Sequence, residues 1–454
     1  MNAVLAELAA TLPADALVTD PDIIEPYRYD RAETVVPGRP LAVVRARCTA
    51  DVQSVLRIAS AHRVPVVPRG AGTGLSGGSA AVDGCITLST ERMRDITVDP
   101  AAMVAVVGPG LFNAEVKAAA REHGLWYPPD PSSFEICSIG GNMATNAGGL
   151  CCVKYGVTTD YVLGLEVVLA DGSVVRLGGR TIKDVAGYDL KRLFVGSEGT
   201  LGIITSATLR LRPLPPPAAT VVATFSDVVD AGRAVAAIMA EMRPAALELM
   251  DRTSVRAVEA QLRMGLDETC GALLLGRSDA GGAQSAAEAA RIEAACAAAG
   301  ATYVAATDDE DEGEQLMAAR RMAIPCVERL GTVLIDDVGV PIPRIPELIG
   351  GVEAVAARTD TVIAVIGHAG DGNFHPLVVF DRADAAAVAR AEEAFGAVMD
   401  VALGLGGTIT GEHGVGTLKR PWLRPQVGDD VAALAKRIKD ALDPLGILNP
   451  GKAL

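Results

Sequence analysis

The segment PRGAGTGLSGGS, residues 68–79, holds five glycines within nine residues and constrains the fold more than any other feature. Its GTGLSG stretch, 72–77, matches the G-x-G-x-x-G pattern of dinucleotide-binding βαβ units, in which a helix opens directly from the loop. An apolar strand precedes the loop at 64–67, but a turn at 83–84 and a second strand at 85–88 follow it. We therefore expect a loop that binds an anion through backbone N–H groups without a helix behind it, and not a Rossmann fold.

Size, charge and cysteine content exclude several classes of protein. A chain of 454 residues should form two or three domains. The net charge of −15, with no block of basic residues, argues against nucleic acid or an anionic membrane surface as a large partner. The eight cysteines contain no C-x-x-C pair, which disfavours a disulfide framework and an iron–sulfur cluster. The N-terminus lacks a basic region, and no apolar stretch is long enough to span a bilayer, so we expect a cytoplasmic protein.

The order of strand and helix patterns indicates several domains. A strand at 41–47, a helix at 50–62 and the strand before the glycine loop predict a β-α-β start. The charge-poor segment 128–149 is expected to pack against a ligand or the core. PLPPP, 213–217, marks the clearest boundary, and beyond it strands alternate with alanine-rich helices. The expected domains are 1–214, 215–410 and a C-terminal segment, 411–454.

Two polar clusters late in the chain hold three of the five histidines. His368 and His375 lie in GHAGDGNFHP, and TGEHGVG adds Glu412 and His413. Two imidazoles and a carboxylate could form a metal site with open positions, and His413 would then be an acid–base candidate. The alternative is that these histidines cap helices or lie in the core with satisfied hydrogen bonds.

Other near-motifs have simpler explanations. GILNPGK, 446–452, resembles a phosphate-binding loop but lacks the Ser or Thr, and no helix can follow it. The acidic run 308–314 is best explained as the start of a helix, where the helix dipole favours negative charge. Arg320 and Arg321, later in that helix, are either surface residues or a clamp for a carboxylate.

Six motifs occur together and in order: PRGAGTGLSGGS, PPDPSS with IGGNMATNAGG, GSEGTLGIIT, GHAGDGNFHP, GEHGVG and LDPLGILNPGK. From about residue 40 to the end, the chain resembles the FAD-linked oxidase family of the vanillyl-alcohol oxidase (PCMH-type) superfamily. Its branches include D-lactate dehydrogenase, the glycolate oxidase flavin subunit and D-2-hydroxyglutarate dehydrogenase. The resemblance implies an α+β fold: a PCMH-type FAD-binding domain of two α/β subdomains, then a substrate or cap domain with a large antiparallel sheet. The segment carrying GEHG should pack back on the FAD domain.

The resemblance also implies where FAD would lie. The glycine loop would hold the diphosphate, and Glu198, Gly202 and Ile203 would lie by the adenine and ribose, with Asn449 by the isoalloxazine. Because only His62 and His123 precede residue 368, both in predicted helices, we expect non-covalent FAD. The full set of expected FAD contacts is Pro68, Arg69, Gly70, Ala71, Gly72, Thr73, Gly74, Gly78, Ser79, Pro129, Asp130, Ser133, Ser138, Gly141, Asn142, Asn146, Gly148, Gly149, Glu198, Gly202, Ile203 and Asn449.

For the chemistry, the resemblance implies that His368, His375 and Glu412 bind a divalent metal, zinc being the expectation. The metal would bind the 2-hydroxyl and carboxylate of a D-2-hydroxy acid, His413 would take the hydroxyl proton, and Arg320 would grip the carboxylate. Met317 stands where the family often has an aromatic residue, which leaves the register of that helix less certain.

Several alternatives remain. A D-2-hydroxyglutarate dehydrogenase would carry polar residues near Ile335 and Leu377, which here favour a monocarboxylate such as D-lactate or glycolate. An alkylglycerone-phosphate synthase-like transferase shares the FAD domain, but Glu412 argues against it. A non-catalytic subunit could lose the His/Glu set that this chain retains. The electron acceptor could be electron-transfer flavoprotein, a quinone or an iron–sulfur subunit. A homodimer and peripheral association with the inner membrane face stay open.

Overall fold

The computed structural model describes residues 3–454, and the chain divides into two compact units. The first unit contains Met1–Gly148, Val157–Leu214 and Glu412–Leu454, and the second contains Gly149–Gly156 and Pro215–Gly411. The division after Leu214 falls inside the proline-rich stretch. The bounds differ from the expected domains in two places, because Gly149–Gly156, including helix α6 (Cys152–Tyr155), and Gly411 belong to the second unit. Side-chain hydrogen bonds from Lys154 and Tyr155 to Asp279 hold this segment there.

The first sheet of the first unit carries the glycine loop. Its strand order is β1-β2-β4-β3, with β2 and β3 parallel to β4, as expected for a β-α-β start. Helix α3 packs on this sheet through Val52, Val55 and Leu56, beside α1. No helix lies between β3 and β4, so the prediction of a loop without a Rossmann helix is confirmed. The elements are α1 (Ala3–Thr11), β1 (Leu17–Val18), α2 (Pro21–Ile24), β2 (Ala42–Arg45), α3 (Thr49–His62), β3 (Val66–Arg69) and β4 (Ile86–Ser89).

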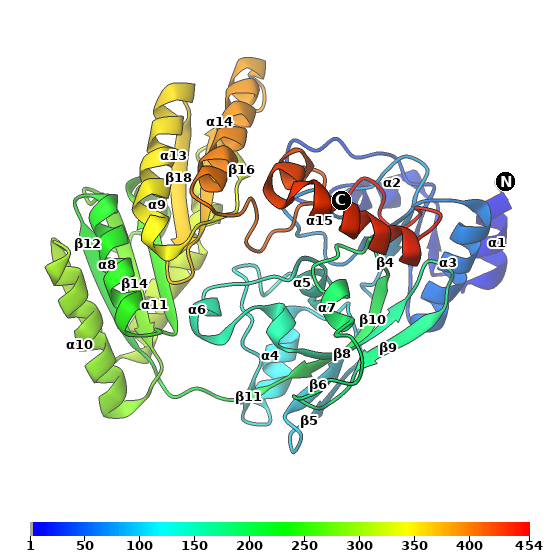
Figure 1. Ribbon diagram of the computed structural model, residues 1–454, viewed down its shortest axis with the longest axis horizontal. Coiled ribbons are helices and arrows are strands. Elements are labelled where there is room, and N and C mark those ends of the chain that lie inside the picture. Colours follow the sequence, from blue (N-terminus) through cyan, green and yellow to red (C-terminus); the bar gives the residue numbers. More distant parts are fainter. Residues whose placement is uncertain (1–2) are drawn as a thin grey trace. The chain divides into compact units, whose positions relative to one another are not determined.

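The second sheet of this unit is antiparallel, in the order β5-β6-β10-β8-β9 (Figure 1). The hairpin predicted at 171–172 connects β8 and β9. Helix α5 was missed inside the charge-poor segment, because Gly140 and Gly141 weaken the helical pattern. Ser138 caps α5 by accepting the N–H of Gly141 at 3.3 Å. The elements are β5 (Ile96–Asp99), β6 (Val104–Val107), α4 (Asn113–Arg121), β7 (Leu125–Trp126), α5 (Ile139–Thr145), β8 (Val162–Val168), β9 (Val174–Gly178), α7 (Lys191–Phe194), β10 (Ile203–Arg210) and β11 (Arg212–Pro213).

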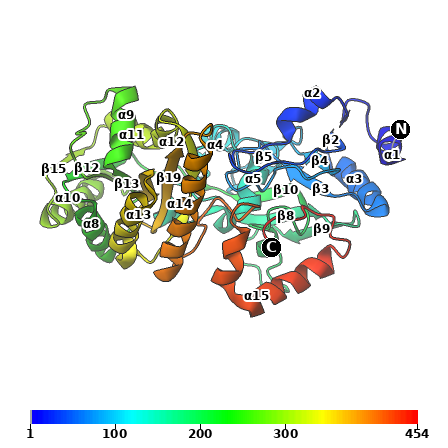
Figure 2. The same cartoon turned by 90° about the horizontal axis from the view of Figure 1, so that it is seen from above.

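The second unit is built on one eight-stranded antiparallel sheet, in the order β15-β12-β14-β13-β18-β19-β16, with β17 also paired to β19. Helices α10, α8, α13 and α14 lie side by side along it (Figure 2). The predicted large antiparallel sheet is confirmed. The strands are β12 (Ala219–Phe225), β13 (Ala246–Asp251), β14 (Ala272–Ser278), β15 (Tyr303–Thr307), β16 (Thr332–Ile335), β17 (Val338–Gly339), β18 (Val362–His368) and β19 (Asn373–Phe380). The helices are α8 (Val228–Glu241), α9 (Arg252–Leu262), α10 (Gly282–Ala298), α11 (Glu310–Arg321), α12 (Ala323–Val327), α13 (Ile345–Thr359) and α14 (Ala385–Gly404).

The acidic run does begin a helix. Asp309 caps α11 by accepting the N–H groups of Asp311 and Glu312. This start fixes the register of α11 and carries Met317 and Arg320 into buried positions.

The end of the chain returns to the glycine loop of the first unit. After α15 (Arg420–Leu442), the N–H of Val66 donates to Ile447, and the N–H of Asn449 donates to Val66, each at 2.8 Å. The chain therefore adds a short parallel bridge beside β3. Lys452 then donates from its buried ammonium to the Gly77 carbonyl at 2.7 Å and to the Thr417 hydroxyl at 2.8 Å. Among the described residues, no helix has the length and apolarity to cross a membrane.

Lys452→Met should lower the melting temperature by several degrees. The substitution keeps most of the buried stem but removes two hydrogen bonds from a charged donor, each worth about 1.5–3 kcal/mol. Scanning calorimetry of the FAD-loaded protein measures the effect. The matched control is Lys436→Met, whose side chain is 72% exposed and pairs with Asp440. An equal effect of the two substitutions would contradict a role for Lys452 in holding the loop.

Candidate functional site

The glycine loop and the start of α5 meet at one hydroxyl. Ser138 accepts the N–H of Ala71 at 3.2 Å as well as that of Gly141 at 3.3 Å. A Cβ at Gly70 would lie 2.2 Å from the Ser138 oxygen, so glycine is required for this approach. Two segments that are separate in the sequence, 68–79 and 138–148, are thereby joined in the first unit.

The tip of the loop suits an anion. Gly72 has φ +75°, and no hydrogen bond within the described residues uses the N–H of Gly72, Thr73 or Gly74. Successive N–H groups without an internal acceptor form an anion-binding concavity. This part of the chain therefore fits the pyrophosphate of a dinucleotide such as FAD, as the sequence motif implied.

A buried carboxylate stands behind the loop. Glu198 is 6% exposed and accepts the N–H groups of Val415 and Gly416, each at 2.8 Å. Asn449 donates its side-chain N–H to the carbonyls of Gly78 and Glu198 at 2.9 and 2.7 Å. Burial raises the pKa of Glu198 to about 7, against the two N–H bonds, which favour the ionised form. Glu198 thus ties the loop, the GEHGVG segment and the chain end together.

Three more of the predicted FAD contacts also have a role within the protein itself. Asn142 accepts from Asn113 at 3.1 Å, and Asn146 accepts the N–H of Thr159 at 2.9 Å, so both amides also organise the segment around α5. Ile203 places its side chain in the hydrophobic core, so any contact of this residue with FAD would come from its backbone. Contacts of all these residues with FAD stay predictions.

His368 and His375 are brought together in the second unit. They lie on neighbouring strands β18 and β19, each 3% exposed, with ring centroids 5.1 Å apart. Because Ile366 pairs with His375, and His368 is two residues further along, both side chains leave the same face of the sheet. One nitrogen of each ring lies within 4.8 Å of one nitrogen of the other, a spacing compatible with a shared metal ion.

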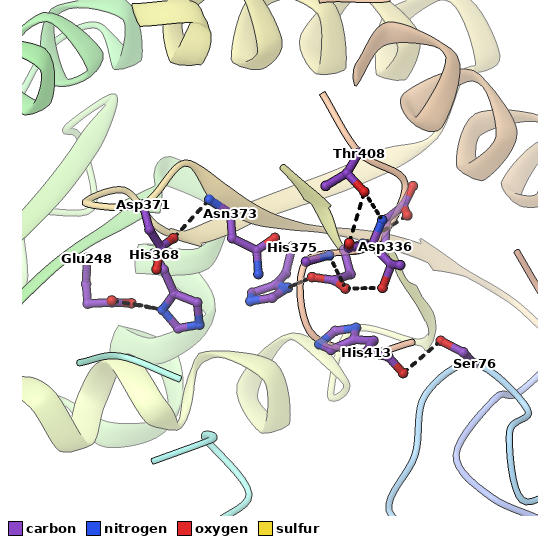
Figure 3. A network of polar contacts seen from close by, with 12 residues as sticks. Ser76, Glu248, Asp336, His368, Asp371, Asn373, His375, Thr408 and His413 are labelled. Carbon is purple, nitrogen blue, oxygen red and sulfur yellow. Dashed lines mark hydrogen bonds and ion pairs between the residues drawn. The ribbon is translucent and has the colours of Figure 1, made fainter. Parts of the chain in front are cut away.

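A buried carboxylate faces His368. Glu248 of β13 is the direct cross-strand partner of His368 and lies 2.9 and 3.0 Å from its Nδ1 (Figure 3). Arg320 of α11 contacts the same carboxylate, with its Nη2 2.9 Å from Oε2 of Glu248. Both Glu248 and Arg320 are 1% exposed, so each neutralises the other's charge in the interior. A carboxylate at Nδ1 directs Nε2 toward a metal, and the donor set therefore fits the implied ion.

A second carboxylate faces His375. Ile335 pairs with Leu377 and Val338 pairs with Phe374, so the register sets Asp337 opposite His375. Asp337 is fully buried, and its Oδ1 lies 3.5 Å from Nδ1 of His375. Ile335 and Leu377, named above for substrate preference, are therefore cross-strand partners on the same face as His375, and both are buried.

The remaining predicted residues are placed as follows. Gly411 ends the second unit, and Glu412, the proposed third ligand, is bonded directly to it. His413 accepts a hydrogen bond at its carbonyl from the Ser76 hydroxyl at 3.3 Å, within the first unit (Figure 3). Arg320 contacts Glu248, and its predicted contact with a substrate carboxylate stays a prediction.

Sequence reasoning missed Glu248, Asp337 and Lys452. Glu248 interrupts the apolar strand AALELM, and Asp336 and Asp337 interrupt the run TVLIDDVGV. A charge inside a buried strand needs a partner, so these interruptions were the available signal. Lys452 lies in GILNPGK, which resembles a phosphate-binding loop, and the sequence does not show that this lysine is buried against the glycine loop.

Comparison with known proteins identifies relatives over nearly the whole chain. The family description "FAD binding domain" matches residues 40–178, and "FAD linked oxidases, C-terminal domain" matches residues 214–453. Glycolate oxidase subunit GlcD of Bacillus subtilis (strain 168) is 42% identical over 94% of this chain and 91% of its own length. D-lactate dehydrogenase of Archaeoglobus fulgidus is 36% identical over 94% of this chain and 95% of its own. The structure of p-cresol methylhydroxylase shares the fold, with a TM-score of 0.84 at 20% identity, covering 100% of this chain and 96% of that one.

Glu198→Gln should weaken the dependence of stability on pH. Because the folded pKa, about 7, exceeds the ordinary value of 4.5, Glu198 contributes stability that is complete below about pH 4.5. That contribution is lost as the pH rises through 7, and a shift of this size corresponds to as much as about 3 kcal/mol. The melting temperature of the wild type should therefore fall more steeply from pH 5 to pH 8 than that of the variant. Parallel curves would show that Glu198 titrates normally.

Proposed function

Because the chain belongs to the FAD-linked oxidase family, we propose that it is an FAD- and divalent-metal-dependent dehydrogenase that oxidises a D-2-hydroxy acid to the 2-oxo acid. Membership makes it an FAD-linked oxidoreductase. The metal, the substrate and the acceptor are the proposed part. The observation that carries the metal is the buried pair His368 and His375, each facing a buried carboxylate at Nδ1.

Each residue of the proposed site would have a separate role in binding or catalysis. We propose that His368, His375 and Glu412 hold the metal, with Glu248 and Asp337 fixing the histidine rings. When bound, the flavin supplies the hydride acceptor and the metal supplies a Lewis acid for the substrate's 2-hydroxyl. His413 would take the hydroxyl proton, since an imidazole exchanges protons near neutral pH. Arg320 would bind the substrate carboxylate while paired to Glu248, because a planar guanidinium can serve more than one oxygen acceptor.

FAD would be held without a covalent bond by the loop of residues 68–79 and the segment 138–149, and acid precipitation should release it. The electrons would pass to an acceptor that the chain does not itself contain. Electron-transfer flavoprotein, a quinone or an iron–sulfur subunit are the candidates, and the subunit name of the Bacillus relative favours a protein partner.

His375→Ala and His413→Asn should separate metal binding from proton transfer. The first variant should lose the metal and the activity but keep FAD, since the glycine loop and residues 138–148 lie in the other unit. The second should keep metal and FAD and lose a factor of about 10² or more in rate, as expected for removal of a general base. Elemental analysis, flavin absorbance and dye-linked turnover measure the three properties. Full activity of His375→Ala, or an active wild type without metal, would exclude the metal mechanism.

The substrate test compares kcat/KM for D-lactate, glycolate, L-lactate and D-2-hydroxyglutarate with a dye acceptor. Burying a second carboxylate against Ile335 and Leu377 would leave a charge unpaired, at a cost of several kcal/mol. We therefore expect D-lactate or glycolate to be preferred, and anaerobic addition of that acid to bleach the flavin. A preference for D-2-hydroxyglutarate would mean that another basic residue reaches its distal carboxylate. No bleaching by any of the four would favour a non-catalytic subunit or a transferase.

A further inference from the structure

Asp337 differs from Glu248 in what its second oxygen does. Glu248 shares its charge with Arg320. Asp337 instead uses Oδ2 to accept the hydroxyl of Thr410 at 2.7 Å and the N–H of Gly411 at 2.8 Å. The same carboxylate thus faces His375 with one oxygen and the segment just before Glu412 with the other.

Further contacts show that the segment 408–411 is built against the strands that carry the histidines. Thr408 pairs with Gly339 of β17 through two backbone hydrogen bonds, of 2.8 and 3.1 Å. A Cβ at Gly411 would lie 2.4 Å from the side chain of Asn373, the first residue of β19, so the backbone approaches that strand closely. The segment is therefore held at its start by β17 and at its end by Asp337 and β19.

We propose that Asp337 is a positioning residue that fixes the ring of His375 and the end of the segment 408–411 at the same time. The negative charge at Oδ1, 3.5 Å from Nδ1 of His375, favours a proton on that nitrogen and leaves Nε2 as the metal-binding nitrogen. Oδ2 fixes the peptide from which Glu412 and His413 follow. His375 and the end of the segment 408–411 thus take their places together within the second unit. This inference rests on the proposed function, because it takes His375 and Glu412 as ligands of one ion.

The geometry gives Asp337 a requirement that an amide cannot meet. Both of its neighbours, the Nδ1 proton of His375 and the donors of residues 410–411, need an acceptor. Asparagine offers one oxygen and turns an NH₂ group toward the other side. Asp337→Asn therefore breaks one of the two contacts whichever way its amide points, while keeping the volume of the side chain.

The zinc affinity of the FAD-loaded protein, measured by competition with a chromophoric chelator, tests the proposal. Asp337→Asn should bind Zn²⁺ about 10- to 100-fold more weakly, the range found when the carboxylate behind a metal-binding histidine is removed. Thr410→Val should weaken binding about fivefold, the equivalent of one hydrogen bond, although Thr410 is not proposed to contact the ion. The double variant should lose less than the product of the two factors, because both act through one carboxylate.

The control is Thr359→Val. Thr359 has a buried hydroxyl that donates to the Val355 carbonyl at 2.8 Å in α13, so it matches the half-buried Thr410 in chemistry but not in place. Its variant should bind Zn²⁺ as the wild type does. Zinc affinity of Thr410→Val within about twofold of this control would overturn the coupling, and wild-type affinity of Asp337→Asn would overturn the orienting role. Flavin absorbance confirms folding, and Thr410→Val carries the test if Asp337→Asn does not fold.

Hydrogen exchange separates failure of this inference from failure of the proposed function. In metal-free protein, the Gly411 amide should exchange faster in Thr410→Val than in Thr359→Val, because the acceptor Asp337 loses its second anchor. If the wild type binds no zinc, the metal proposal fails and the exchange result still decides whether Asp337 fixes the segment. If zinc binds but neither affinity nor exchange responds to Thr410→Val, only the role of Asp337 is wrong.

Discussion

A carboxylate removed from water has to be compensated, and that requirement organises both units of this protein. Glu198, Glu248 and Asp337 are 6%, 1% and 0% exposed. Glu198 accepts two backbone N–H groups, Glu248 is paired with a guanidinium and an imidazole, and Asp337 accepts a hydroxyl and an N–H. In each case the compensating groups come from distant parts of the chain. Each carboxylate therefore joins segments that are far apart in the sequence.

The glycine loop shows the same dependence on remote residues. In a Rossmann unit the helix that follows the loop supplies rigidity and positive potential. Here β4 follows instead, and the loop is supported by Ser138 at one side and by Lys452 and Asn449 from the chain end. Glycine is required at Gly70 by the contact with Ser138, and at Gly72 by its positive φ. The G-x-G-x-x-G pattern therefore occurs here in a structure other than a Rossmann unit, because residues from other parts of the chain support the loop.

The parts that could be predicted from sequence are those set by local pattern or by ordered motifs. The β-α-β start, the hairpin at 171–172, the capped start of α11 and the large antiparallel sheet followed from periodicity, turn residues and resemblance. Helix α5 was not predicted, because the glycines within it allow close packing but lower the helix propensity of the segment. The roles of Glu248 and Asp337 were not predicted, because they depend on the register between paired strands. In the case of Glu248, that register brings it to His368, 120 residues away in the sequence. Register is a tertiary property, and a single sequence shows only that a charge interrupts an apolar run.

The segment from Gly411 to Gly416 is where these constraints meet along the chain. Its first N–H donates to Asp337, and its last two donate to Glu198. Each unit thus holds one end of six residues through a buried carboxylate, and Glu412 and His413 lie between the two anchors. Glycines at 411, 414 and 416 allow this path, since Gly414 and Gly416 have positive φ and Gly411 lies against Asn373. The proposed ligand and the proposed base therefore each lie close in sequence to a peptide that a buried carboxylate holds within its own unit.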